Sequence, residues 1–171
     1  MDSEKKISTV VVATVKSADI AGLAKQYAEI GLDSVLSEGL LRDIPLVNIF
    51  IALGRLGVSI NDQIFAKKLV RFLSSLADLS AEDRASMVER LDKEDGFRRQ
   101  VGDRLIEILD RIDSHAKPEM VAKVFRAYAL KQIDFDMLSR LNYAIDRLPQ
   151  FEAKRVREFC SASIRGAPQY A

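Results

Sequence analysis

The segment IPLVNIFIALGRLGVSI, residues 44–60, is the most apolar part of this 171-residue chain. Its only polar side chains are Asn48, Arg55 and Ser59. Pro45 suits the first turn of a helix, where no backbone N–H is needed, and Gly57 suits a helix end. A helix that is apolar nearly all round is typical of the centre of a helical protein. We therefore expect a central helix from Ile44 to about Leu56.

Apolar residues also recur at three- and four-residue spacing on both sides of this segment, which predicts amphipathic helices. Ser80 followed by Asp83, Pro118, and Asp134 or Asp136 are typical helix starts, and Pro149 ends a helix. The expected helices cover about residues 19–38, 60–78, 80–91, 97–112, 118–129, 134–148 and 151–164. The sequence thus predicts an all-α fold, an irregular bundle of seven or eight helices around the central apolar helix.

The N-terminal region is the one place where a strand competes with a helix. Residues 7–15 are rich in β-branched side chains, which favour strands. We expect an N-terminal arm over residues 1–18, with strand and first helical turn both left open. A single helical domain over residues 19–165 and a C-terminal tail over 166–171 complete the expected organisation.

Composition excludes several classes of function. The formal net charge is only +1, whereas a domain that binds nucleic acid is normally clearly basic. One cysteine, Cys160, allows no internal disulfide and suits a reducing compartment, so a cytoplasmic location is expected. The one histidine, His115, falls in a charged turn, where an exposed structural role is the simpler interpretation. We expect no catalytic residues, no cofactor and no small-molecule substrate.

Carboxylates offer a weak metal-binding hypothesis. Asp110 and Asp113 end one predicted helix, and Asp134 and Asp136 begin another. If the fold brought them together, their oxygens would suit a hard cation. Solvated helix surface is the alternative interpretation.

The apolar segment also has two alternatives to a place in the core. Its 17 residues are at the lower limit for a membrane-spanning helix, which needs about 20. The next helix carries a cluster of cations that would suit anionic lipid headgroups. Insertion into a membrane and docking in a groove of a partner protein therefore both stay open. The residues expected to make either contact are Phe50, Leu53, Lys67, Lys68 and Arg71.

Several short motifs resemble those of small, mostly uncharacterised bacterial helical proteins. The motifs are LLRDIPLV at 40–47, GVSI at 57–60, FAKKL at 65–69, FRAY at 125–128 and AIDR at 144–147. The resemblance covers about residues 33–148. It implies a bacterial origin and a role beside mobile-element, stress or phage-defence genes, and it brings no catalytic residues. A more distant resemblance to the tellurite-resistance helical domains implies metal binding through paired acidic residues.

These observations favour a non-enzymatic helical interaction protein, an accessory or regulatory component that binds a partner protein or forms a homo-oligomer. The alternatives are a membrane-acting effector that inserts residues 44–60 and a metal-binding module that uses the carboxylates.

Overall fold

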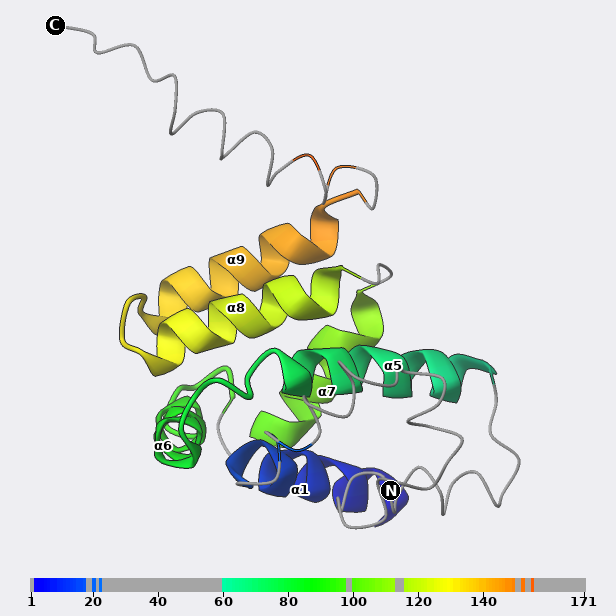
Figure 1. The fold of residues 1–171 in the computed structure, drawn as a ribbon, viewed down its shortest axis with the longest axis horizontal. Coiled ribbons are helices and arrows are strands. Elements are labelled where there is room, and N and C mark those ends of the chain that lie inside the picture. Colours follow the sequence, from blue (N-terminus) through cyan, green and yellow to red (C-terminus); the bar gives the residue numbers. More distant parts are fainter. Residues whose placement is uncertain are drawn as a thin grey trace, which may run out of the picture.

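The computed structural model describes residues 2–17, 20, 22, 60–97, 100–112, 116–149, 152 and 155. Within these residues every regular element is an α-helix (Figure 1). The helices are α1 (Asp2–Lys16), α5 (Ile60–Ser74), α6 (Ala81–Leu91), α7 (Val101–Arg111), α8 (Lys117–Ala129) and α9 (Phe135–Arg147). The predicted all-α class is confirmed. The expected central helix at 44–56 and the helices expected at 19–38 and 151–164 lie outside the described residues.

Local capping chemistry explains where two of these helices begin. The Ser80 hydroxyl accepts a hydrogen bond from the Asp83 N–H at 3.0 Å and donates one to the Asp83 carboxylate at 2.6 Å. At the start of α9, the Asp134 carboxylate accepts a hydrogen bond from the Met137 N–H at 2.8 Å. Each bond satisfies a backbone donor that has no partner within its helix. Both starts agree with the sequence prediction.

Residues 2–16, which the sequence places in an N-terminal arm, form the packed helix α1. Its Val11 and Val15 are fully buried, and α1 packs against α6 and α7. A β-branched residue costs a helix only tenths of a kcal/mol, whereas burying a valine side chain gains about 1.5 kcal/mol or more. Burial therefore decides the alternative left open for residues 7–15 in favour of a helix.

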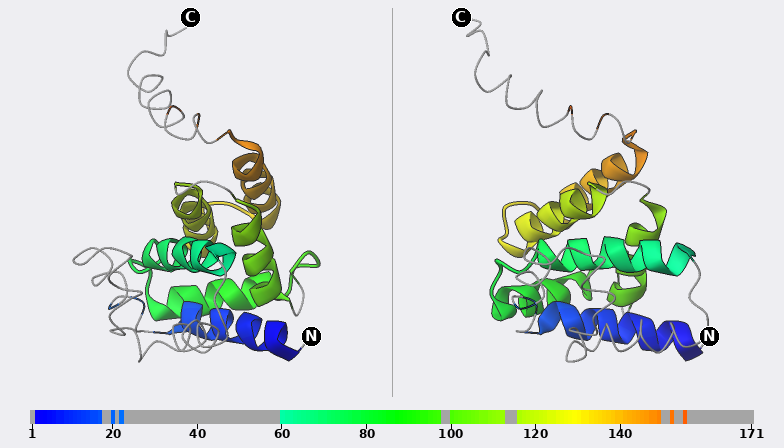
Figure 2. Two further views of the ribbon diagram at one scale, coloured as in Figure 1. Left: turned by 90° about the vertical axis from the view of Figure 1, so that its right-hand side faces the viewer. Right: turned by 45° about the vertical axis from the view of Figure 1, so that its right-hand side comes forward.

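The helices form layers that are easiest to follow from α1 upwards (Figure 1). α1 lies at one end, α5, α6 and α7 occupy the middle, and α8 and α9 form an antiparallel hairpin at the other end, as Figure 2 also shows. α8 packs against α5, α6 and α9, and α7 reaches α9 through a smaller contact. Within the described part of the chain, α8 and α7 thus each pack against three other helices, since α7 also contacts α1 and α5.

Aromatic side chains connect these layers in the core. Phe72 of α5 and Phe97 both meet Phe125 of α8 edge to face, at centroid distances of 5.7 and 6.4 Å. Phe97 also meets Phe135 of α9 at 5.7 Å. Phe97 was expected inside a helix spanning 97–112, but it lies in the turn before α7, which begins at Val101. The buried ring therefore anchors a turn.

The helix α5 is shorter than predicted. It was expected to reach residue 78, but it ends at Ser74 and the chain continues as turns.

Candidate functional site

Exposed apolar side chains gather on the α8–α9 hairpin. Among the described residues, the exposed large hydrophobic side chains are Ile64, Leu130, Met137, Leu141 and Tyr143. All but Ile64 belong to α9 or to the turn that precedes it. Contiguous exposed apolar surface in a folded protein often marks a place where another molecule binds.

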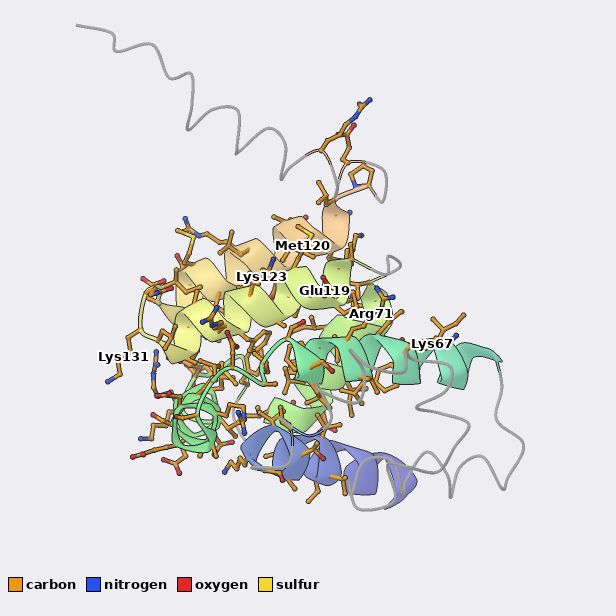
Figure 3. The ribbon with its side chains drawn as sticks, in the orientation of Figure 1. Lys67, Arg71, Glu119, Met120, Lys123 and Lys131 are labelled. Atoms are coloured by element: carbon orange, nitrogen blue, oxygen red, sulfur yellow. The ribbon has the colours of Figure 1, made fainter. Side chains whose placement is uncertain are left out.

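Met137, Leu141, Ala144 and Leu148 lie at helical spacing along one side of α9. Met137 is 43% exposed and Leu141 37% exposed. At the turn, Leu130 extends this apolar surface, and half-buried Met120 adjoins it between α8 and α9 (Figure 3). We call Met120, Leu130, Met137, Leu141 and Ala144 the hairpin face.

The three- and four-residue spacing of Leu138, Leu141, Ile145 and Leu148 predicts that all four lie inside the bundle. The structure buries Leu138 and Ile145, whereas Leu141 is exposed and Leu148 is partly so. α8 is the main neighbour of α9, and one packed helix covers only part of an apolar surface this wide. The expectation for Leu141 is therefore wrong.

Positive charge borders the hairpin face. Figure 3 shows Lys123 on α8 and Lys131 at the turn between α8 and α9. Both are exposed, and neither forms an ion pair with another residue that the structure describes. Two nearby acids have cationic partners: Asp136 pairs with Arg140 at 2.8 Å, and Glu119 faces Arg71 at 3.9 Å. A third acid, the exposed Asp134, caps α9. Lys123 and Lys131 are thus the cations beside this face without an ion-pair partner among the described residues.

Lys131 has an unusual backbone. Its φ is 58°, in the left-handed region that glycine normally occupies. The turn after α8 is a Schellman motif, with the Gln132 N–H donating to the Ala127 carbonyl at 2.9 Å and the Lys131 N–H to the Tyr128 carbonyl at 3.0 Å. A lysine at this position costs free energy that glycine would not, and such residues cluster at functional sites.

The predicted cations of α5 do not form one basic surface. The Lys68 ammonium donates to the backbone carbonyl of Asp110 at 3.0 Å, near the end of α7. Lys67 and Arg71 lie along the side of α5 that is visible in Figure 3, and Arg71 is turned towards Glu119 of α8. Phe50 and Leu53, named with them as contact residues, lie outside the described residues. No helix in the described ranges is long and apolar enough to cross a membrane.

The carboxylates proposed as metal ligands have other roles where the structure describes them. Asp134 caps α9, Asp136 pairs with Arg140, and Asp110 is exposed on α7. Asp113, like His115 and Cys160, lies outside the described residues. Among the residues that are described, no three histidine, cysteine or carboxylate side chains gather in a way that could hold a metal ion.

A groove runs between α7 and α9, on the side of α9 opposite the hairpin face. It has a volume of about 330 Å³, and its apolar lining includes Ile108, Ile112, Phe135 and Leu138. The Phe97–Phe135 ring contact lies at one end, and an ion pair between Arg111 and Asp146 at 3.3 Å joins the two helices at the other. These contacts make the groove a bounded pocket.

Asn142 lines this groove and is only 9% exposed. Both its amide nitrogen and its amide oxygen are buried without a hydrogen-bond partner among the residues that the structure describes. Each such group costs about 1–3 kcal/mol of stability when no partner compensates for lost water. The sequence analysis did not name Asn142. Its signal was present, because Asn142 lies four residues after Leu138 and three before Ile145, on the buried stripe of α9.

Comparison of the chain with protein-family models, curated proteins and solved structures gives no significant match.

Proposed function

We propose that this protein is a non-enzymatic interaction protein that uses the hairpin face to bind a helix of a partner protein. The observation that carries the proposal is the exposed apolar stripe of Met137, Leu141 and Ala144 along α9. An amphipathic helix binds its partner through apolar residues at i, i+3, i+4 and i+7 spacing, and the stripe on α9 has this spacing. A cytoplasmic, accessory or regulatory role, as in bacterial stress or phage-defence systems, fits this mode of action.

The charge around the hairpin face favours an acidic partner. Lys123 lies on α8 and Lys131 at the turn between α8 and α9 (Figure 3), and the neighbouring carboxylate of Asp136 already has an arginine partner. Opposite charges at the rim of an interface select the partner and speed its association. The expected ligand is therefore an amphipathic helix with Leu, Ile, Val or Phe on one side and Asp or Glu beside them.

The length of α9 sets the length of the bound segment. α9 has 13 residues, which corresponds to about 20 Å of helix. A partner helix of three to four turns would cover the hairpin face from Leu130 to Ala144. A segment of this size suits a regulatory contact that forms and breaks, because transient encounters are found at the low end of the range of interface sizes.

Selection from a phage-displayed library of helical peptides tests the proposal. We expect the wild-type protein to enrich amphipathic peptides with acidic flanks, and the variant Leu141→Asp to lose this enrichment. Ser139→Asp is the matched control, because Ser139 is exposed on the opposite side of α9, beside the groove. The double variant Lys123→Glu, Lys131→Glu should shift the enriched peptides towards basic flanks.

Enrichment that survives Leu141→Asp unchanged would contradict the proposal, as would enriched peptides without an apolar stripe. A second copy of the chain could occupy this face in place of a partner helix. Sedimentation of the wild-type protein and of Leu141→Asp tests for such a dimer. A dimer that dissociates on Leu141→Asp would replace the partner helix by self-association.

A further inference from the structure

The groove between α7 and α9 is a second binding feature, distinct from the hairpin face. Asn142 lies in it with an N–H donor and a carbonyl acceptor that the rest of the described chain leaves without partners. The two groups belong to one planar amide, so they are fixed side by side. A molecule that satisfies both must present an acceptor and a donor at the same spacing.

We infer that this groove binds a neutral, flat molecule through an edge that carries one hydrogen-bond donor beside one acceptor. Primary carboxamides, lactams and nucleobases have such an edge, and paired hydrogen bonds from an asparagine amide to a base are a common form of recognition. The shared chemistry is the amide-like edge on a planar body.

The walls of the groove fit a flat apolar body. Phe97, Ile108, Phe135 and Leu138 contribute aromatic and aliphatic surface close to Asn142. The volume of about 330 Å³ is at the lower end of the range of about 300–1,000 Å³ for small-molecule sites. Because the ring contact and the ion pair bound the groove, a compact molecule fits it better than an extended chain.

The rim of the groove favours a neutral ligand. Arg104 contacts Glu107 at 2.6 Å, Glu107 contacts Arg111 at 3.5 Å, and Arg111 contacts Asp146 at 3.3 Å. Two cations and two anions therefore alternate along the rim and leave no net charge. A phosphate or a carboxylate on the ligand would gain little there.

The Asn142 amide lies just beneath the groove surface, since its polar atoms are buried without the ligand. Binding of such a ligand therefore requires the side chain to rotate about its own bonds so that the amide edge faces the groove. This rotation breaks no hydrogen bond to the described residues, because the Asn142 amide has no partner among them in the absence of ligand. Ligand binding then supplies the partners that the fold does not.

Matched pairs of small molecules test this inference on the full chain by calorimetry and thermal unfolding. Benzamide is compared with N,N-dimethylbenzamide, and uridine with 3-methyluridine, so that each pair differs in the N–H donor. We expect benzamide or uridine to bind and to raise the melting temperature, and the methylated partner to bind at least about tenfold more weakly. Binding of benzamide would indicate a carboxamide ligand, and binding of uridine would indicate a nucleobase ligand.

The variant Asn142→Leu supplies a second readout. Because it replaces an unpaired buried amide by an apolar side chain of similar size, we expect the melting temperature without ligand to rise by roughly 2–4 °C. Binding should be lost at the same time. An asparagine with a purely structural role would give the opposite change in stability.

Ser139→Trp keeps the test independent of any effect of Asn142→Leu on folding, because Ser139 is an exposed residue that lines the groove. The bulky side chain should block ligand entry and leave the helical circular dichroism unchanged. Binding by neither benzamide nor uridine overturns the inference. Equal binding of the methylated partners, or binding that survives both variants, overturns it too.

Discussion

Arg84 shows how one buried side chain can hold two distant parts of the chain together. Arg84 is 2% exposed, and its guanidinium donates to the carbonyl of Val15 at 2.8 Å, in the last turn of α1, and to that of Ser17 at 2.6 Å, just after α1. It also donates to the carbonyl of Leu79, just before α6. Burial lowers the pKa of Arg84 from its ordinary value, and the hydrogen bonds compensate for the lost water.

Replacing Arg84 should therefore destabilise the protein strongly. Arg84→Met leaves the carbonyls of Val15, Ser17 and Leu79 without this donor, and we expect a loss of about 3 kcal/mol or more in the free energy of unfolding. Arg84→Lys should recover only part of it, because an ammonium lacks the planar fork of donors. Urea unfolding measures both values. A loss below about 1 kcal/mol for Arg84→Met would contradict this role.

The hydrogen-bond partners of Arg84 could not be predicted from the sequence. Its position on α6 could be, because Arg84 lies three residues before Met87 and four before Val88, on the buried stripe of the helix. Arg84 is buried because it donates to backbone carbonyls at the end of α1 that have no partner within that helix, about 70 residues earlier in the chain. Only the tertiary packing of α1 against α6 brings them together.

Tyr128 gives a prediction for alkaline pH. Burial raises the pKa of its hydroxyl above the ordinary value of about 10, against the opposing effect of the Arg90 guanidinium, which lies 4.1 Å from the ring centre. Because the folded state holds this proton more tightly than the unfolded state, the contribution to stability is fully present below about pH 10. It is lost as the pH rises through the pKa of the folded state.

We expect the melting temperature of the wild-type protein to fall above about pH 10 more steeply than that of Tyr128→Phe. Thermal unfolding followed by circular dichroism between pH 8 and pH 12, about two pH units on either side of 10, measures the difference. Parallel profiles for the two proteins would show that Tyr128 does not link stability to pH.

At the scale of elements, α1 depends on a close backbone contact with α7. A Cβ atom added to Gly102 would lie 2.2 Å from the backbone carbonyl oxygen of Ser8. Glycine is normally unfavourable inside a helix by about 1 kcal/mol relative to alanine. The gain from alanine is not available here, because a side chain would push α1 away from α7.

Gly102→Ala should thus lower the free energy of unfolding by about 1–3 kcal/mol, as overpacked positions do. Gly22→Ala is the matched control, since a Cβ atom there has no heavy atom of the described residues within 4 Å, and it should be neutral or slightly stabilising. Chemical denaturation of both variants measures the contrast. Equal effects of the two substitutions would rule out the close contact as the cause.

The turn between α8 and α9 carries a prediction with two readouts. Lys131→Gly removes the cost of a lysine at φ 58°, and we expect stability to rise by up to about 1 kcal/mol. The same variant removes a cation from the hairpin face, so it should weaken binding of an acidic helix. Thermal unfolding and peptide titration measure the two effects. A variant that binds as well as the wild type would remove Lys131 from the proposed interface.

A feature of a helix could be predicted from the sequence when the residues that cause it lie close together in the chain. The starts of α6 and α9 follow from Ser80 and Asp134, whose partners are three residues away, and the sequence predicts both. The helical state of residues 7–15 and the exposure of Leu141 depend on which helix covers which side. Those neighbours are distant in sequence. Periodicity alone therefore left helix and strand open for residues 7–15, and it wrongly predicted that Leu141 is buried.

At the scale of the whole molecule, the α8–α9 hairpin presents different chemistry on its two sides. One side is the hairpin face, apolar with cations beside it, and the other lines the groove that contains Asn142. The sequence predicts an all-α fold, which the structure confirms, and its contact residues in 44–60 and on α5 stay a prediction. Periodicity places Asn142 on the buried stripe of α9, but it does not tell which helix faces packing leaves uncovered.

The most direct test of the central claim is a titration of the isotope-labelled protein with an acidic amphipathic peptide from the library selection, followed by the chemical shifts of backbone amides and methyl groups. The proposal predicts saturable shifts at Leu130, Met137 and Leu141, with residues of α1 and α6 unaffected. Saturable shifts centred on α1 and α6, or no saturable shifts at the hairpin face, would contradict it.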